Sequence, residues 1–210
     1  MLPKSLRAKI SLARPSVRRQ RAREVALRAE LFGIEQLARH AQFIAARHTV
    51  VTGRASAWLL RRLDQNEKVL RAFNRATLAV DQSRHVTPAA EWLLDNFYLI
   101  EEQIQLARRH LPEHYSRELP RLANGPSAGF LRVYDIVLEL IAHVDAQVDV
   151  DSLSAFVAAY QTVAPLKLGE LWAVPIMLRL GLIENLARIS TGLAQGRRDR
   201  NLANQWVERL

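Results

Sequence analysis

Residues 128–144 read Ala-Gly-Phe-Leu-Arg-Val-Tyr-Asp-Ile-Val-Leu-Glu-Leu-Ile-Ala-His-Val, which is apolar around most of a helical circumference. A helix of this kind has little polar surface to offer to water, so other helices must enclose it. Elsewhere Ala, Leu, Arg and Glu dominate the 210 residues, whereas Gly and Pro number only eight each. We therefore predict an all-α protein, a compact bundle of about six to seven helices with this stretch near its centre.

The other helices are predicted from apolar residues spaced three and four positions apart and from helix breakers. They cover about 24–47, 55–80, 88–110, the stretch from an Asp149 or Asp151 cap to about 163, 168–191, and a last amphipathic segment over 197–210. Pro175 either kinks its helix or marks the start of that helix, and Gly192 is the expected C-terminal cap. No breaker precedes Leu210, so two interpretations stay open: a natural full-length product, or a chain cut from a longer protein.

Positive charge is concentrated at the N-terminus. Residues 1–23 carry eight Lys and Arg and no acid, and the remainder has 22 basic and 21 acidic residues. We expect this arm to be disordered and residues 24–210 to form a single helical domain, with a candidate sub-boundary in the proline-marked loop 111–128. The arm could bind phosphate groups or anionic lipid, whereas the nearly neutral body makes nucleic acid an unlikely partner. The candidate phosphate- or lipid-binding residues of the arm are Arg14, Arg18, Arg19, Arg21 and Arg23.

Motifs of common enzyme classes are absent from the sequence. There is no Gly-x-Ser-x-Gly elbow, no Gly-x-x-x-x-Gly-Lys loop and no Gly-x-Gly-x-x-Gly fingerprint. Because there is no cysteine, disulfides and thiolate metal sites are excluded, and the scattered histidines do not form the Glu-x-x-His pairs of helical metal sites. No run approaches the roughly 20 apolar residues that span a bilayer. The sequence therefore predicts no catalytic residue, no cofactor and no metal site.

Two blocks, 90–103 and 169–186, concentrate carboxylates, amides and tryptophan. Glu91 and Asp95 lie one helical turn apart, with Glu102 near the same face, and such acids serve in acid–base catalysis only where burial makes their pKa values differ. We favour the alternative that these acids are solvated or paired with Arg108, Arg109 or Arg132.

The tryptophans of these blocks have two interpretations. Trp92 and Trp172, beside Glu and Asn, are typical of a sugar-binding surface, but a core position with a satisfied indole N–H is the interpretation that we favour. Arg179 and Asn185 are expected to satisfy buried carboxylates such as Glu170 or Glu184, because an unpaired buried charge is costly.

The same blocks carry a resemblance to a known family. The segments Thr-Pro-Ala-Ala-Glu-Trp-Leu-Leu-Asp-Asn-Phe at 87–97, Tyr-Ser-Arg-Glu-Leu-Pro at 115–120, Leu-Gly-Glu-Leu-Trp-Ala-Val-Pro at 168–175 and Leu-Ile-Glu-Asn-Leu at 182–186 occur in one order. They resemble the N-terminal region of bacterial cyclic β-1,2-glucan synthases. The resemblance covers about residues 55–200.

This resemblance implies a setting rather than an activity. These synthases are very large inner-membrane proteins, in which a glycosyltransferase uses UDP-glucose and a divalent metal to build a β-1,2-glucan. The residues for that chemistry lie downstream of the region that this chain resembles, so none is assigned here. The resemblance implies a non-catalytic module, in the cytoplasm or at the cytoplasmic face of the inner membrane, whose partner is the remainder of the synthase.

Such a module would act as a scaffold or as a glucan-contacting surface. The candidate glucan-contacting or structural polar residues are Glu91, Trp92, Asp95, Asn96, Glu101, Glu102, Gln103, Glu170, Trp172, Arg179 and Asn185. The alternative function is that of a helical protein whose basic arm, residues 1–23, binds an anionic membrane surface or nucleic acid.

Overall fold

The computed structural model describes residues 26–27, 29–52, 58–79, 86–111 and 119–207, which contain seven helices and two short strands. The elements are α2 (Ile34–Arg47), β1 (Val50–Val51), α3 (Trp58–Leu78), α4 (Pro88–Asp95), α5 (Phe97–His110), β2 (Arg121–Leu122), α6 (Arg132–His143), α7 (Val150–Gln161) and α8 (Leu168–Val207). The two strands pair antiparallel, with Val50 opposite Leu122. The predicted all-α class is confirmed, because each strand has only two residues.

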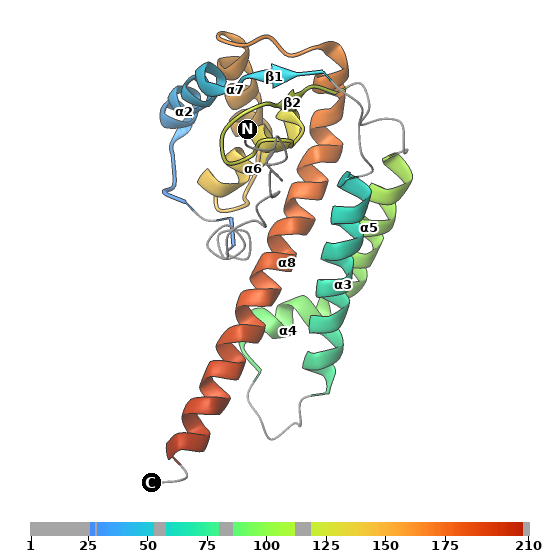
Figure 1. The fold of residues 1–210 in the computed structure, drawn as a ribbon. Helices are drawn as coiled ribbons and strands as arrows, with labels where there is room; N and C mark the ends of the chain where they lie inside the picture. Colours follow the sequence, from blue (N-terminus) through green and yellow to red (C-terminus); the bar gives the residue numbers. More distant parts are fainter. Residues whose placement is uncertain (1–25, 28, 53–57, 80–85, 112–118, 208–210) are drawn as a thin grey trace, which may run out of the picture.

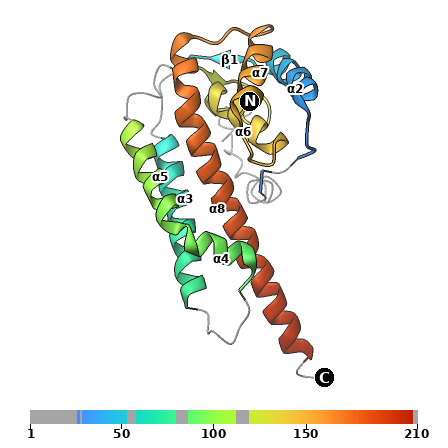
Figure 2. The same ribbon diagram turned by 180° about the vertical axis from the view of Figure 1, so that it is seen from behind.

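The long helix α8 organises the molecule (Figures 1 and 2). The helices α3, α4 and α5 lie on one side of α8. The helices α2, α6 and α7 lie with both strands around the N-terminal half of α8. The last turns of α8 extend past α3 and α4 toward the C-terminus (Figure 1). None of the described helices is both long and apolar enough to cross a membrane.

Helix α6 is the enclosed helix that the sequence predicted. Ten of its twelve residues are buried. One face of α6, including Tyr134 and Val137, joins the apolar cluster formed with α3, α5 and α8, and the other face, including Ile136 and Leu140, joins the cluster formed with α2 and α7. The single helix therefore links two hydrophobic cores, which requires apolar residues on most of its circumference.

The first helix begins at Ile34, ten residues later than predicted. Part of the preceding segment instead lies along the C-terminal end of α6, where the Ala29 N–H donates to the Ala142 carbonyl at 2.9 Å and the Phe32 N–H donates to the His143 carbonyl at 3.1 Å. The last carbonyls of a helix have no partner within the helix, so they accept hydrogen bonds from other segments. These bonds hold the backbone of this segment outside α2.

The helix predicted over 88–110 is divided into α4 and α5 at Asn96. The backbone of Asn96 leaves helical geometry at φ −99° and ψ 11°, and its side-chain Nδ2 donates to the Trp92 carbonyl at 2.8 Å. Asparagine side chains often compete in this way with helical hydrogen bonds. The chain therefore turns between α4 and α5, which point in different directions (Figure 1).

The prediction that Gly192 ends a helix is wrong, because α8 is continuous over 40 residues. Gly192 lies inside the helix and does not adopt the left-handed conformation of a C-terminal glycine cap. Arg197 of this C-terminal part donates to the Ala76 carbonyl of α3 at 3.1 Å, so packing against α3 supports the continuation. Pro175 also lies inside α8 and does not mark its start.

Candidate functional site

A largely apolar groove of about 390 Å³ lies between α8 and the helices α4 and α5. We call it the α8 groove. On α8 the lining residues recur every three or four positions, so they occupy one face of the helix. The lining residues are Trp92, Leu99, Ile100, Gln103, Pro175, Leu178, Arg179, Leu182, Ile183 and Leu186.

The tryptophans of the two sequence blocks are on the surface. Trp92 lines the groove with 56% of its surface exposed, and Trp172 is 72% exposed one turn before Pro175 on the same face of α8. The favoured prediction that both are core residues is therefore wrong. The buried faces of their helices are formed by smaller residues such as Ala90 and Ala173, so each tryptophan is turned outward.

Two polar side chains join across the groove. The Arg179 Nε of α8 donates to the Gln103 Oε1 of α5 at 3.0 Å. No other described residue takes up the Gln103 amide N–H groups or the terminal guanidinium N–H groups of Arg179. These donors are therefore available to an oxygen-rich ligand. The prediction that Arg179 neutralises Glu170 or Glu184 is wrong.

Glu184 is instead neutralised by arginines of α3 and α8. Its carboxylate accepts from Arg62 Nε at 2.5 Å, from Arg188 Nε at 3.1 Å and from the Tyr134 hydroxyl at 2.5 Å. Burial alone would raise the pKa of Glu184, but the hydrogen bonds and positive charge of Arg62, with those of its other partners, lower it to about 2. Glu184 is therefore a buried structural anion and not a proton donor near neutral pH.

Glu170 has a comparable role at the start of α8. It accepts from Arg132 Nε at 2.8 Å and Nη2 at 2.5 Å, and from the Lys167 backbone N–H at 3.0 Å. Burial alone would lower the pKa of Arg132, but the hydrogen bond and charge of Glu170 raise it. Among the described residues, the hydrogen bond of the Asn185 side chain goes not to an acid but to the Leu27 backbone, whose N–H donates to Asn185 Oδ1 at 2.7 Å.

The acids of the block 90–103 are not gathered into a buried site. Glu91, Asp95 and Glu102 are exposed, and Glu101 pairs with Arg71 at 3.0 Å. Acid–base catalysis by these residues would require burial that separates their pKa values, and Glu91, Asp95 and Glu102 are not buried.

The predicted arginine partners of these acids have other partners. Arg108 pairs with Asp64 at 2.8 Å and Glu67 at 2.6 Å, whereas Arg132 pairs with Glu170. The favoured prediction is confirmed in its first alternative, because Glu91, Asp95 and Glu102 are solvated. Its second alternative, pairing with Arg108 or Arg132, is wrong, because the packing of α5 against α3 and of α6 against α8 brings other carboxylates closer to these arginines.

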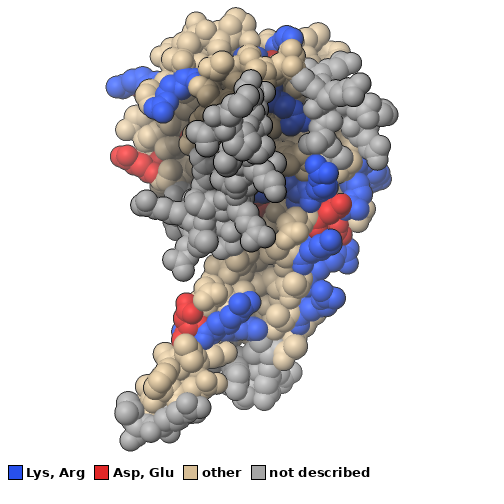
Figure 3. Space-filling model, viewed as in Figure 1, with Lys and Arg blue, Asp and Glu red and all other residues tan. Residues whose placement is uncertain are grey.

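The arm residues Arg14, Arg18, Arg19, Arg21 and Arg23 lie outside the described residues. On the described surface, Figure 3 shows Lys and Arg on α2, along α3 and toward the C-terminal end of α8, with a few carboxylates between them. In the α8 groove the charged lining residue is Arg179.

The groove residues that the sequence did not indicate as site residues are apolar, and most of them are leucines, such as Leu99, Leu182 and Leu186. Their only signal is that α8 has more apolar residues between 173 and 187 than one buried helix face requires. Some of these additional apolar residues line the α8 groove.

Comparison with known proteins gives one informative match. No family model matches the chain. The chain is 40% identical over 147 residues to the cyclic beta-(1,2)-glucan synthase NdvB of Rhizobium meliloti (strain 1021). The aligned part is 70% of this chain but only 5% of that relative, so the chain spans a small part of the length of the synthase. The resemblance predicted from the sequence is confirmed.

Proposed function

We propose, starting from this similarity to a segment of a cyclic β-(1,2)-glucan synthase, that the chain is a non-catalytic helical module of such a synthase. In this proposal the α8 groove contacts the β-1,2-glucan, and the module lies beside the remainder of the synthase at the cytoplasmic face of the inner membrane. UDP-glucose and its metal are used by that remainder.

The observation that carries the proposal is the combination of an exposed indole and free N–H donors in one groove. A glucose unit has apolar C–H faces that stack on an aromatic ring, and Trp92 offers such a ring. The hydroxyl oxygens of the same unit accept hydrogen bonds, which the Gln103 amide and the Arg179 guanidinium can donate. Sites for small ligands are typically apolar with a few placed polar groups, as in this groove.

The positions of the acids support a non-catalytic role. Glu170 and Glu184, the buried carboxylates of α8, are held by Arg132 and Arg62, so neither is available to transfer a proton. The acids of the block 90–103 are solvated or paired at the surface. An activity in glucan synthesis would then come from the parts of the synthase that this chain does not align with.

Isothermal titration with β-1,2-linked gluco-oligosaccharides tests the glucan contact. We expect the folded chain to bind them, and we expect Trp92→Ala and Arg179→Met each to weaken binding by at least tenfold. Trp206→Ala is the matched control, because Trp206 is also exposed on α8, at 63%, but lies outside the groove. β-1,4-Linked gluco-oligosaccharides of equal length control for the linkage.

Two outcomes would overturn the glucan contact. One is the absence of binding by a chain whose circular dichroism shows a folded helical protein. The other is equal weakening by Trp92→Ala and Trp206→Ala. The scaffold role is tested separately, by deleting the aligned segment from the Rhizobium meliloti synthase and restoring glucan production with the segment from this chain.

A further inference from the structure

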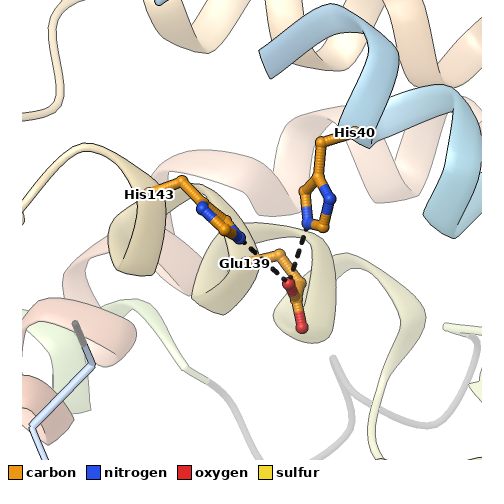
Figure 4. A group of neighbouring side chains, drawn as sticks. All are labelled: His40, Glu139 and His143. Carbon is orange, nitrogen blue, oxygen red and sulfur yellow. Dashed lines mark hydrogen bonds and ion pairs between the residues drawn. The ribbon is translucent and has the colours of Figure 1, made fainter. Parts of the chain in front are cut away.

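Three side chains with metal-ligating atoms converge between α2 and α6 (Figure 4). His40 comes from α2, and Glu139 and His143 come from α6. Glu139 Oε2 lies 3.0 Å from His40 Nε2 and 3.9 Å from His143 Nε2. One ligand atom from each of the three lies within 4.8 Å of the others.

The positions of these residues follow from the fold. Glu139 and His143 are four residues apart, so they lie on the same face of α6. His40 is 99 residues away from Glu139 and reaches it only because α2 packs beside α6. The sequence predicted no metal site because its histidines are far apart along the chain. Tertiary packing nevertheless brings two of them, His40 and His143, close to Glu139.

The His143 ring is oriented for coordination. Its Nδ1 lies 2.7 Å from the Glu30 backbone carbonyl, which can only accept, so Nδ1 carries the proton. In the neutral ring the lone pair is then on Nε2, the atom that faces Glu139. Metal-bound histidines typically have their other ring nitrogen bound to a carbonyl or carboxylate in this way. Phe32 stacks on the ring at 4.0 Å between centroids and holds its plane.

The distances fit a single small cation. Zn²⁺ binds His nitrogen and Glu oxygen at about 2.0–2.2 Å in tetrahedral geometry, so two of its ligand atoms are roughly 3.4 Å apart. The two separations measured here, 3.0 and 3.9 Å, lie on either side of this value. Two imidazoles and one carboxylate are a ligand set that first-row transition metals use when a further position stays open.

The open side of the cluster faces a hollow of about 290 Å³, which His40 and Glu139 help to line. The same hollow is lined by His48 and Asp135, whose Nε2 and Oδ2 atoms lie 3.2 Å apart. A metal ion could enter from this hollow and keep a water molecule there as a further ligand.

We propose that His40, Glu139 and His143 form a binding site for one divalent first-row transition metal ion, of the Zn²⁺ class. The ion joins α2 to α6 and keeps a coordination position open toward the hollow. The alternative is that His40 and Glu139 form only a hydrogen-bonded ion pair, with His143 beside it. The site does not depend on the glucan contact proposed above, since no residue is shared with the α8 groove.

Titration of the metal-free chain with Zn²⁺ tests the proposal, and Co²⁺ absorption reports the coordination geometry. We expect one metal ion per chain, a melting temperature that rises with Zn²⁺ and falls again with chelator, and d–d bands of low-coordinate Co²⁺. His40→Gln and Glu139→Gln should each weaken Zn²⁺ binding by at least tenfold. They are preferred to His143 variants because His143 is buried and its ring also bonds to the Glu30 carbonyl, so its replacement would affect folding more.

His110→Gln is the matched control, because His110 is an exposed histidine at the end of α5. It should bind Zn²⁺ as the unchanged chain does. The proposal is overturned if the folded chain does not bind Zn²⁺ or Co²⁺. It is also overturned if His40→Gln and Glu139→Gln bind as tightly as His110→Gln, which would leave the ion pair as the only role of the cluster.

Discussion

Arg62 of α3 and Glu184 of α8 form a two-pronged ion pair between residues 122 positions apart. The Arg62 Nε donates to Oε2 at 2.5 Å, and its Nη2 donates to Oε1. The Tyr134 hydroxyl of α6 donates to the same carboxylate, so three helices meet at one buried charge. Because an unpaired buried carboxylate is costly, this cluster favours the observed packing of α3 and α6 against α8 over other arrangements.

Glu184→Gln is expected to lower the free energy of unfolding at neutral pH by about 3 kcal/mol, because Arg62 loses its charged partner. The pKa of Glu184 is about 2 in the folded chain and 4.5 for an ordinary glutamate. A lowered folded-state pKa means that this stabilisation is complete above about pH 4.5 and is lost as the pH falls toward 2. Urea unfolding at several pH values should show a shallower acid slope in the variant. An equal dependence of stability on acid pH in the variant and the unchanged chain would contradict a lowered pKa of Glu184.

Arg132→Met is expected to destabilise the chain by about 3–5 kcal/mol, because it leaves the fully buried Glu170 without a cation. Arg132→Met combined with Glu170→Leu should recover most of this loss, since two apolar residues need no partner. Thermal and urea unfolding of the single and double variants measure the coupling. A double variant that is less stable than Arg132→Met would show that loss of the Arg132–Glu170 pair is not the cause of the destabilisation.

Gly181→Val is expected to destabilise the chain by about 1–3 kcal/mol through overpacking. A Cβ atom at Gly181 would lie 2.7 Å from Ile141 Cδ1, where α8 crosses α6. Gly192→Ala is the matched change in the same helix, and since nothing lies within 4 Å of its Cβ position it should stabilise by about 0.5–1 kcal/mol. A destabilising Gly192→Ala would contradict a continuous α8.

Tryptophan fluorescence should separate surface indoles from packed ones. Trp172→Ser should change the free energy of unfolding by less than about 0.5 kcal/mol, because this side chain is 72% exposed. Variants that keep only Trp92 or Trp172 should be quenched readily by acrylamide. A variant that keeps only Trp58, which packs 4.6 Å from Phe130 between ring centroids, should be quenched less. Strong shielding of Trp172 would place it in a core after all.

Local pattern predicted much of the fold. The apolar circumference of α6 required that helix to be enclosed, and Pro88 marked the start of α4. Of the two predicted caps of α7, Asp149 is the one observed, because its carboxylate accepts the Ser152 N–H at 2.6 Å. These features depend on neighbours within one or two turns, so sequence spacing records them. The similarity to the synthase was also visible in the order of the sequence blocks.

The candidate sites were predicted less well. Sequence blocks indicated Trp92, Gln103 and Arg179, but nothing in them showed that these side chains share a groove, because Arg179 is 76 positions from Gln103. The partners of Glu170 and Glu184 were predicted wrongly for the same reason. A buried carboxylate requires a positively charged partner, but the local sequence around the carboxylate does not specify which arginine is that partner.

The sequence by itself determined that this chain forms helices, that one of them is enclosed, and that it carries no motif of a familiar enzyme class. Only the tertiary structure decided that Asn96 separates two helices, that Trp92 and Trp172 face outward, and that His40 meets Glu139 and His143. The physical reason is that apolar spacing fixes how much of each helix must be buried, whereas the packing of helices distant in the chain fixes which side chains meet.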